Sequence, residues 1–128
     1  MHAYSITCCT FARKRWFEST ATVRAAQSQL MQCASGQCVA VLAYCFMPDH
    51  VHLLIEGTSE ASDLPQFVVR WKQKTGYERR RTMGDRLWQG GFYDHVLREE
   101  EDRLVVVKYI LENPVRAGLI ESLFDRRD

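Results

Sequence analysis

The sequence predicts an α+β fold in which helices cover a ferredoxin-like antiparallel sheet, and three observations support this prediction. The chain has 128 residues, of which 46% are hydrophobic and 26% charged, values typical of one ordinary globular domain. Its segments follow strand and helix patterns in the order β-α-β-β-α-β-α. No repeat, low-complexity tract or linker interrupts that order. We therefore expect residues 1–128 to form a single domain.

The first third of the chain reads as strand, helix and strand. Residues 4–11 alternate and are rich in β-branched and aromatic side chains, which predicts a strand. From about residue 18 to 33 apolar side chains recur at helical spacing, and Gly36 follows as a stop signal. Residues 38–47 form an apolar run without polar alternation, a pattern typical of a strand buried on both faces. We expect this strand to lie at the centre of the sheet.

A tight turn and a second strand follow the apolar run. Pro48 presets the backbone dihedral angle of a turn and Asp49 suits the next position, so residues 50–56 are expected to return as a hairpin. Alternation along this strand places His50 and His52 on one face together with Leu54. The other face carries Val51, Leu53 and Ile55.

The second half of the pattern supplies two helices and one strand. A helix is predicted from Ser62 or Asp63 to about Gly84. The stripe expected on this helix consists of Leu64, Phe67, Val68, Trp71 and Thr75. An irregular strand follows at residues 87–98, and a last helix runs from about 99 to 113. The apolar stripe expected on the last helix consists of Leu104, Val106, Val107, Ile110 and Leu111.

Charge and cysteine usage limit the class of protein. The formal net charge is only +1, so composition alone does not indicate a nucleic-acid partner. The five cysteines form no CxxC pair and lie mostly in apolar segments, which favours reduced core thiols over disulfides or a zinc site. The longest apolar run is about half of the roughly 20 residues that a membrane helix needs, and no signal peptide is recognisable. We expect a cytoplasmic protein without a membrane segment.

Two histidines, His50 and His52, are the most informative residues. Positions i and i+2 of a strand place both imidazoles on one face, about 6 to 7 Å apart at Cα, where two rings can converge on one metal ion. The alternative is a pair of ordinary hydrogen-bonded sheet residues. The last helix offers partners for such a site, because Tyr109 and Asn113 are four residues apart and share a helix face. For these two, the alternatives are a packing tyrosine and a helix-ending asparagine before Pro114.

Basic residues are concentrated in one segment despite the near-neutral total. Residues 70–86 hold seven basic and two acidic side chains, with Trp71 and Tyr77 interleaved. This composition suits phosphate contacts and base stacking, although a solvated helix face is the alternative. A smaller basic cluster follows the first strand. The candidate DNA contacts are Arg13, Lys14, Arg15, Arg70, Lys72, Lys74, Arg79, Arg80 and Arg81.

Three segments carry a resemblance to a known family. Residues 47–54 (MPDHVHLL), 88–98 (WQGGFYDHVLR) and 109–119 (YILENPVRAGL) stand in the same order and spacing as in the REP-associated tyrosine transposases. These proteins form part of the single-tyrosine branch of the HUH endonuclease superfamily. The resemblance extends from about residue 4 to 119. Asp49 stands where relatives often have asparagine. Because the sequence ends soon after Leu119, we expect no counterpart of the C-terminal extension seen in some members.

The resemblance implies a fold, a reaction and a set of site residues. It implies the ferredoxin-like sheet with an additional helix carrying Tyr109 as nucleophile, and His50, His52 and Asn113 as ligands of Mg²⁺ or Mn²⁺. The implied enzyme is a transposase that cuts single-stranded DNA near hairpins through a covalent 5′-phosphotyrosine intermediate and transfers the strand, in a bacterial cytoplasm. It also leaves open whether each site is completed within one chain or by the partner chain of a homodimer.

Several alternatives remain at the level of sequence. Tyr93, beside Asp94 and His95, is the one serious rival to Tyr109 as nucleophile. His95 and Asp49 are candidates for lining the site. The competing functions are an inactive, domesticated protein that binds hairpin DNA, and a non-enzymatic ferredoxin-like RNA-binding module in which the two histidines are ordinary sheet residues.

Overall fold

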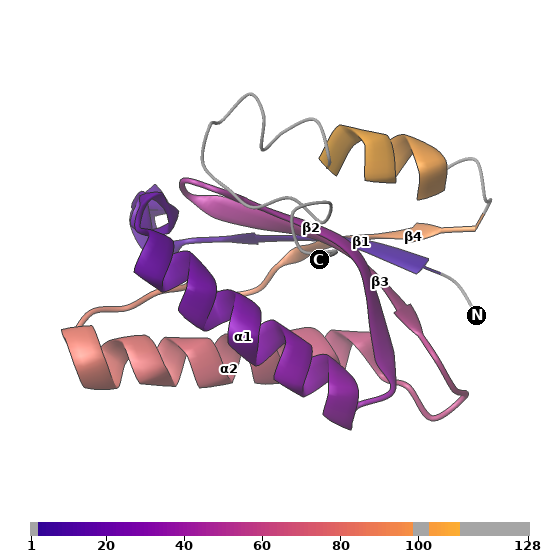
Figure 1. Ribbon diagram of the computed structural model, residues 1–128, viewed down its shortest axis with the longest axis horizontal. Coiled ribbons are helices and arrows are strands. Elements are labelled where there is room, and N and C mark those ends of the chain that lie inside the picture. The colour runs from indigo at the N-terminus through magenta and orange to yellow at the C-terminus, as the bar shows by residue number, and fades with distance from the viewer. Residues whose placement is uncertain (1–2, 99–102, 111–128) are drawn as a thin grey trace.

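The computed structural model describes residues 3–98 and 103–110 and contains the predicted antiparallel sheet covered by helices. The strands are β1 (Ala3–Cys9), β2 (Val39–Met47), β3 (His50–Gly57) and β4 (Tyr93–Leu97), in the order β2-β3-β1-β4. Helices α1 (Thr20–Gly36) and α2 (Leu64–Met83) cover one face, and a helix formed by 103–110 lies over the other (Figure 1). The predicted α+β fold with an antiparallel sheet covered by helices is therefore confirmed.

Local signals in the sequence explain where the two long helices begin and end. Ser19 caps α1 by accepting a hydrogen bond from the Thr22 amide. Asp63 caps α2 in the same way, accepting from the Gln66 amide at 3.0 Å. Gly84 ends α2 in the left-handed conformation, with φ of 80°, which favours glycine. These positions lie within a few residues of the predicted boundaries.

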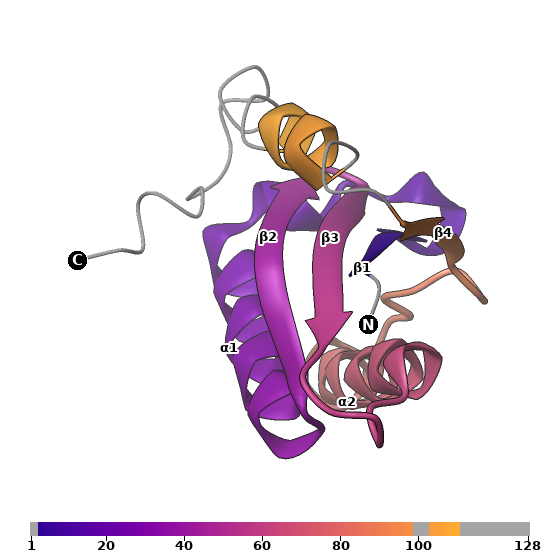
Figure 2. The ribbon, with the colours of Figure 1, turned by 90° about the vertical axis from the view of Figure 1, so that its right-hand side faces the viewer.

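Strand β2 lies at the edge of the sheet, so the prediction that this apolar run is central was wrong. Tyr44 and Phe46 belong to the hydrophobic cluster that includes α1 and α2, whereas Ala43 and Cys45 belong to the cluster on the opposite face. The run is apolar because helices cover both faces of β2, as Figure 2 shows. Burial of both faces of a strand does not indicate whether the strand pairs with one neighbour or with two.

The first strand ends earlier than predicted. Thr10 forms only an isolated bridge to Trp88, and Phe11 opens the short 3-10 helix η1 (Phe11–Arg13). A second 3-10 helix, η2 (Trp16–Glu18), leads into α1. The Thr10 hydroxyl donates to the Lys14 carbonyl at 2.6 Å, which holds the chain in this turn instead of a continued strand.

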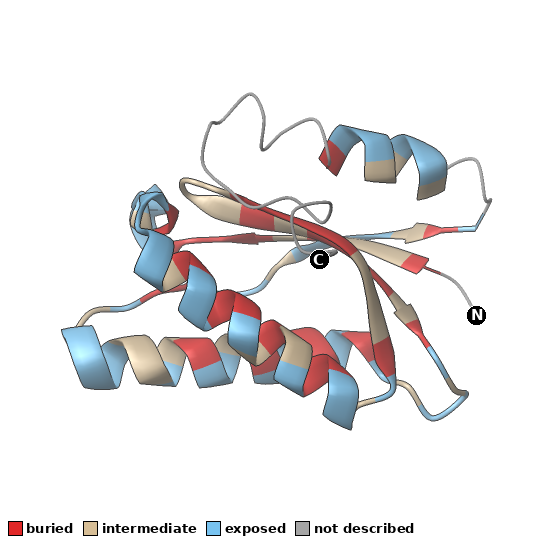
Figure 3. Ribbon diagram, in the orientation of Figure 1, coloured by how far each residue is buried: buried red, intermediate tan, exposed pale blue. Residues whose placement is uncertain are grey.

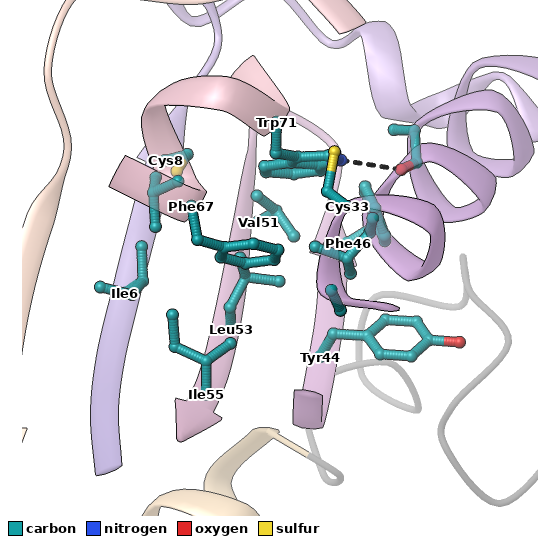
Figure 4. Close-up of a cluster of buried hydrophobic side chains, with 14 of the residues drawn as sticks. Ile6, Cys8, Cys33, Tyr44, Phe46, Val51, Leu53, Ile55, Phe67 and Trp71 are labelled. Carbon is teal, nitrogen blue, oxygen red and sulfur yellow. Dashed lines mark hydrogen bonds between the residues drawn. The ribbon is translucent and has the colours of Figure 1, made fainter. Parts of the chain in front are cut away.

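The main core lies between the sheet and the two long helices (Figure 4). Trp71 of α2 is fully buried and its indole N–H donates to the Ala26 carbonyl of α1 at 2.9 Å. Trp88 is also buried, and its indole N–H donates to Thr75 Oγ1 at 2.8 Å. The predicted inward stripe of α2 is confirmed in full: Leu64, Phe67, Val68, Trp71 and Thr75 are its buried residues. Both tryptophans thus fill the core without leaving a donor unpaired.

A smaller core lies under the helix 103–110 on the other face of the sheet. Ile110 is buried there against Ala43, Cys45 and Leu54, with Val106 and Val107 partly buried. Leu104, predicted to be buried, is 66% exposed. The reason is geometric: a helix that meets a sheet on one side only buries a narrow stripe, and Leu104 lies outside it. The exposed outer side of this helix is visible in Figure 3.

Two predictions from composition have clear outcomes. All five cysteines are free, and four of them are buried, while Cys38 is exposed. Within the part of the chain that the structure describes, no helix is long and apolar enough to cross a membrane.

The Thr75 hydroxyl offers a test of the core. We expect Thr75→Val to lower the free energy of unfolding by about 1–3 kcal/mol, because the buried Trp88 indole N–H loses its acceptor. Thr75→Ser keeps the hydroxyl and should cost less. Urea unfolding monitored by tryptophan fluorescence measures both, and equal losses in the two variants would contradict the explanation.

Candidate active site

The site begins with the alternation of side chains along β3. Val51, Leu53 and Ile55 belong to the main core, whereas Leu54 belongs to the smaller core under the helix 103–110. His50 and His52 therefore face the same side as that helix. The two-residue Pro48-Asp49 turn places His50 at the first position of the strand. The predicted hairpin and its division into two faces are confirmed.

The two imidazole rings lie side by side. Their centroids are 4.8 Å apart, with the planes at 85°. His50 Nδ1 lies 2.8 Å from Asp49 Oδ1, and His52 Nδ1 lies 3.1 Å from Thr7 Oγ1 of the adjacent strand β1. Each ring thus has one nitrogen held by a neighbour, and neither Nε2 has a hydrogen-bond partner among the described residues. Such an arrangement is typical of metal-binding histidines.

Two charged groups hold the turn before His50. Asp49 bonds to His50 through one carboxylate oxygen and accepts from Arg13 Nε through the other at 3.0 Å. Burial acts to raise the pKa of Asp49, but the hydrogen bonds from His50 and Arg13 outweigh burial and hold the pKa below its ordinary value. Asp49 is therefore an ionised carboxylate, and it lies beside the histidine pair, where the sequence predicts it to line the site.

His52 is neutral at neutral pH. Burial, followed by the nearby His50, lowers the pKa of His52 to about 4. A neutral imidazole has a free lone pair, which metal coordination needs.

Tyr109 lies next to the histidine pair, on a different element. Its ring centroid is 5.6 Å from that of His52, and the side chain is half exposed. Two contacts set the position of its helix: Ile110 is buried against the sheet, and Arg103 Nη2 lies 2.5 Å from Glu56 Oε2 near the other end of β3. The helix thus runs along β3 from Glu56 toward His52, and the chain brings Tyr109 to its own histidines.

Only part of the predicted set of metal ligands lies within the described residues. They contain no group of three or more His, Cys, Asp or Glu side chains that could hold a metal ion. The third predicted ligand, Asn113, lies outside the described residues. Cys45 pairs with His52 across the hairpin, but burial raises the pKa of its thiol to about 12, so it remains a neutral thiol. The donors present are two imidazoles, which fit a site that needs a further oxygen ligand.

Tyr93 and His95 lie on the same face but farther away. Tyr93 pairs with Thr7 and His95 with Ser5, both on β1, so each is two strands from β3, about 10 Å at the backbone. Both are exposed, and neither has a hydrogen bond to the histidine pair within the residues the structure describes. The structure brings Tyr109, not Tyr93, into contact with His52.

The predicted DNA-binding residues are distributed over several surfaces. Arg13 is bonded to Asp49, and Lys14 and Arg15 lie beside it with partners in Trp16 and Glu18. Helix α2 lies on the face of the sheet opposite the histidine pair (Figure 1). Because successive residues of a helix are about 100° apart, its cations are spread around the helix instead of sharing one face. Within the described residues, the side chains of Lys72, Arg79 and Arg81 have polar partners, whereas those of Arg70, Lys74 and Arg80 have none.

Sequence reasoning missed three supporting residues. Thr7 holds His52, and the Glu56–Arg103 ion pair holds the helix of Tyr109. Glu56 could have been noticed, because it continues the alternation that selects His50 and His52. Nothing local indicates Thr7 or Arg103, since each acts through a contact between distant segments.

Sequence comparisons place the chain among transposases. Residues 1–113 match the family model described as Transposase IS200 like. A candidate REP-associated tyrosine transposase of Haemophilus influenzae is 27% identical over 95 residues, which cover 66% of this chain and 54% of that protein. An uncharacterized protein of the same organism is 27% identical over 99 residues, covering 60% of this chain and 55% of its own length. The chain thus spans about half the length of the curated relatives it matches.

Solved structures share the fold. A REP-associated tyrosine transposase bound to a REP hairpin superposes with a TM-score of 0.75 at 19% identity, over 93% of this chain and 70% of that one. A candidate transposase from Deinococcus radiodurans gives a TM-score of 0.65 at 22% identity, over 88% of this chain and 91% of that one. With the family model matching from the first strand through the helix of Tyr109, the chain belongs to the Transposase IS200 like family.

Proposed function

We propose that the protein is a metal-dependent, single-tyrosine DNA endonuclease and strand transferase that acts on single-stranded DNA next to a hairpin. The observation that carries the proposal is the contact of the Tyr109 ring with His52, at 5.6 Å between centroids, in a chain of a transposase family. The solved neighbour bound to a REP hairpin supports hairpin DNA as the substrate class.

Tyr109 would supply the nucleophile. Its Oη forms a bond to the phosphorus of a backbone phosphate while the bond from phosphorus to the 3′ oxygen breaks. The phenol loses its proton, and the 3′ oxygen takes one up and leaves as a free hydroxyl. The 5′ phosphate stays on the tyrosine as an ester, so a second 3′ hydroxyl can reverse the step and join a new strand. Half exposure of Tyr109 leaves its phenol open to such a substrate.

His50 and His52 would hold Mg²⁺ or Mn²⁺ through Nε2, together with Asn113. When bound, the ion would act as a Lewis acid on a phosphate oxygen and offset charge on the leaving group. Asp49 and Thr7 orient the two rings by holding Nδ1 of each. This support comes from two strands and a turn, which is the rigid placement that a metal site requires.

The first test is formation of the covalent adduct. Wild-type protein incubated with labelled single-stranded hairpin DNA and Mn²⁺ is expected to yield a protein–DNA adduct that survives denaturing electrophoresis. Tyr109→Phe should form none, because the nucleophilic oxygen is absent, and chelation with EDTA should abolish the adduct of the wild type.

Tyr93→Phe is the matched control, since it removes the same atom from the rival tyrosine. It should retain adduct formation because Tyr93 lies two strands from His52. The reverse result would assign the nucleophile to Tyr93. A wild type that binds the hairpin but forms no adduct would indicate the inactive, binding-only alternative.

Metal binding can be measured without catalysis. Calorimetric titration with Mn²⁺ should detect a site that His52→Gln removes. Asp49→Ala should weaken the affinity by about 10- to 100-fold, because His50 loses the group that holds its Nδ1. Asp49→Asn keeps an acceptor oxygen and should lose less. Equal affinities in the wild type and His52→Gln would refute the assignment of the ligands.

The Arg103–Glu56 ion pair should affect catalysis without affecting metal binding. Glu56→Gln is expected to slow adduct formation by about 10- to 100-fold, since a shift of about 1 Å in the nucleophile has effects of that size. The exchanged pair, Glu56→Arg with Arg103→Glu, should restore part of the rate. Single-turnover adduct kinetics and Mn²⁺ titration together measure this; a parallel loss of Mn²⁺ affinity would contradict a role in placing Tyr109.

A further inference from the structure

We propose that a pocket between α2 and the segment 86–92 binds the base of an unpaired DNA nucleotide close to the cleavage site. This inference rests on the proposed function, because it assigns a second contact to the single-stranded part of the same substrate. The lining residues that carry the argument are Gln73, Tyr77, Arg80, Arg86, Trp88 and Gln89.

The size of the pocket fits a base. Its volume is about 400 Å³, within the roughly 300–1,000 Å³ of typical small-ligand sites. Three glycines, Gly76 from α2 and Gly90 and Gly91 from the segment 86–92, line it and leave it hollow. Lys72 holds the segment in place by donating to the carbonyls of Gln89 and Gly91. Hydrogen bonds thus fix the segment 86–92, which forms one wall of the pocket.

The uncharged lining has the chemistry of a base site. Tyr77 is 68% exposed, so its ring is not needed in the core and presents a face on which a base can stack. The exposed amides of Gln73 and Gln89 offer both hydrogen-bond donors and acceptors, which suit the edge of an unpaired base.

The charged lining suits a phosphate. Among the described residues, Arg80 and Arg86 have no carboxylate partner, whereas Arg79 and Arg81 are paired with Asp85 and Glu78. Arg86 is held in place, because its Nε donates to the Trp88 carbonyl at 2.9 Å and its guanidinium lies over the Phe11 ring. Two cations without a neutralising partner at the rim of an aromatic pocket match a nucleotide better than an apolar partner.

The pocket also lies close to the proposed active site. The Gln89 amide donates to the Cys9 carbonyl at 3.0 Å, and Cys9 pairs with His50 on the other side of β1. Segment 86–92 is therefore about two strand spacings, roughly 10 Å, from the histidine pair. The pocket lies on the α2 side of the sheet and the histidine pair on the other side, so a DNA strand that contacts both would pass over the end of β1.

Another cavity, between α1 and α2, does not combine an aromatic ring, amides and unpaired cations in this way. It measures about 520 Å³ and lies between α1 and α2, lined largely by small side chains. Its cation, Arg79, is already bonded to Asp85 and Thr22. That cavity offers no phosphate partner.

DNA binding in the absence of cleavage tests the proposal. The full chain carrying Tyr109→Phe is titrated, in EDTA, against a fluorescent single-stranded oligonucleotide of mixed sequence, and the dissociation constant is measured by anisotropy. Adding Tyr77→Ala should weaken binding by about 5- to 100-fold, the range that loss of one base–aromatic stack produces. Tyr77→Phe should bind as well as the parent. Met83→Ala, which removes another exposed side chain of α2, should change nothing.

Two further measurements locate the contact. Arg80→Gln should reduce the slope of log K against log salt by about 0.7, the value for one phosphate of a single strand. Arg98→Gln, an equal charge change outside the pocket, should not. Photocrosslinking with 5-iodouracil DNA should label Tyr77, as mapped by mass spectrometry.

The outcomes separate this proposal from the preceding one. Equal affinities for Tyr77→Ala and Met83→Ala, or no binding of the oligonucleotide by the parent, would refute the proposal that the pocket binds a base. Loss of binding in Tyr77→Ala with an unchanged melting temperature supports it. Binding through Tyr77 in a wild type that forms no covalent adduct would overturn the nuclease proposal and leave the pocket standing.

Discussion

The alternation of side chains along β3 is the constraint on which the rest of the molecule depends. Val51, Leu53 and Ile55 fill the core under α1 and α2, while His50 and His52 face the helix of Tyr109. A shift of one residue in register would exchange the two sets, burying imidazoles and exposing the apolar side chains. Because β3 pairs with β1 on one side and with β2 on the other, β3 cannot slip without breaking both ladders.

The proposed chemistry is divided between two elements held in different ways. The histidines stand on a central strand, and hydrogen bonds from the turn and from β1 hold their rings. Tyr109 stands on a helix that runs along β3, and this helix is positioned by the buried Ile110 and by the ion pair Arg103–Glu56. The proposed ligands are therefore placed by sheet geometry, and the proposed nucleophile by the docking of a helix. A change in the helix contacts can move the nucleophile without disturbing the ligands.

Only the fold shows which basic side chains are neutralised by ion pairs and which are available to bind an anion. The basic segment is dense in sequence, yet ion pairs neutralise some of its members and the helix turns others to different sides. Arg80 and Arg86 are left without a carboxylate partner in the described structure, and they line one pocket with Tyr77. A formal net charge of +1 is thus compatible with a local anion site, because the two acidic residues of the basic segment, Glu78 and Asp85, are paired with Arg81 and Arg79.

Sequence by itself determined the order of the elements, the hairpin at Pro48-Asp49, the stripe of α2 and the shared face of His50 and His52. Each of these follows from periods of 2 or 3.6 residues and from local capping, which act over a few residues. Only the tertiary structure decided that β2 lies at an edge, that Leu104 points outward, that Tyr109 rather than Tyr93 meets His52, and that Thr7 and Glu56 support the site. These features depend on which strands pair and where a helix docks, and such contacts join segments far apart in the chain, where no local period reaches.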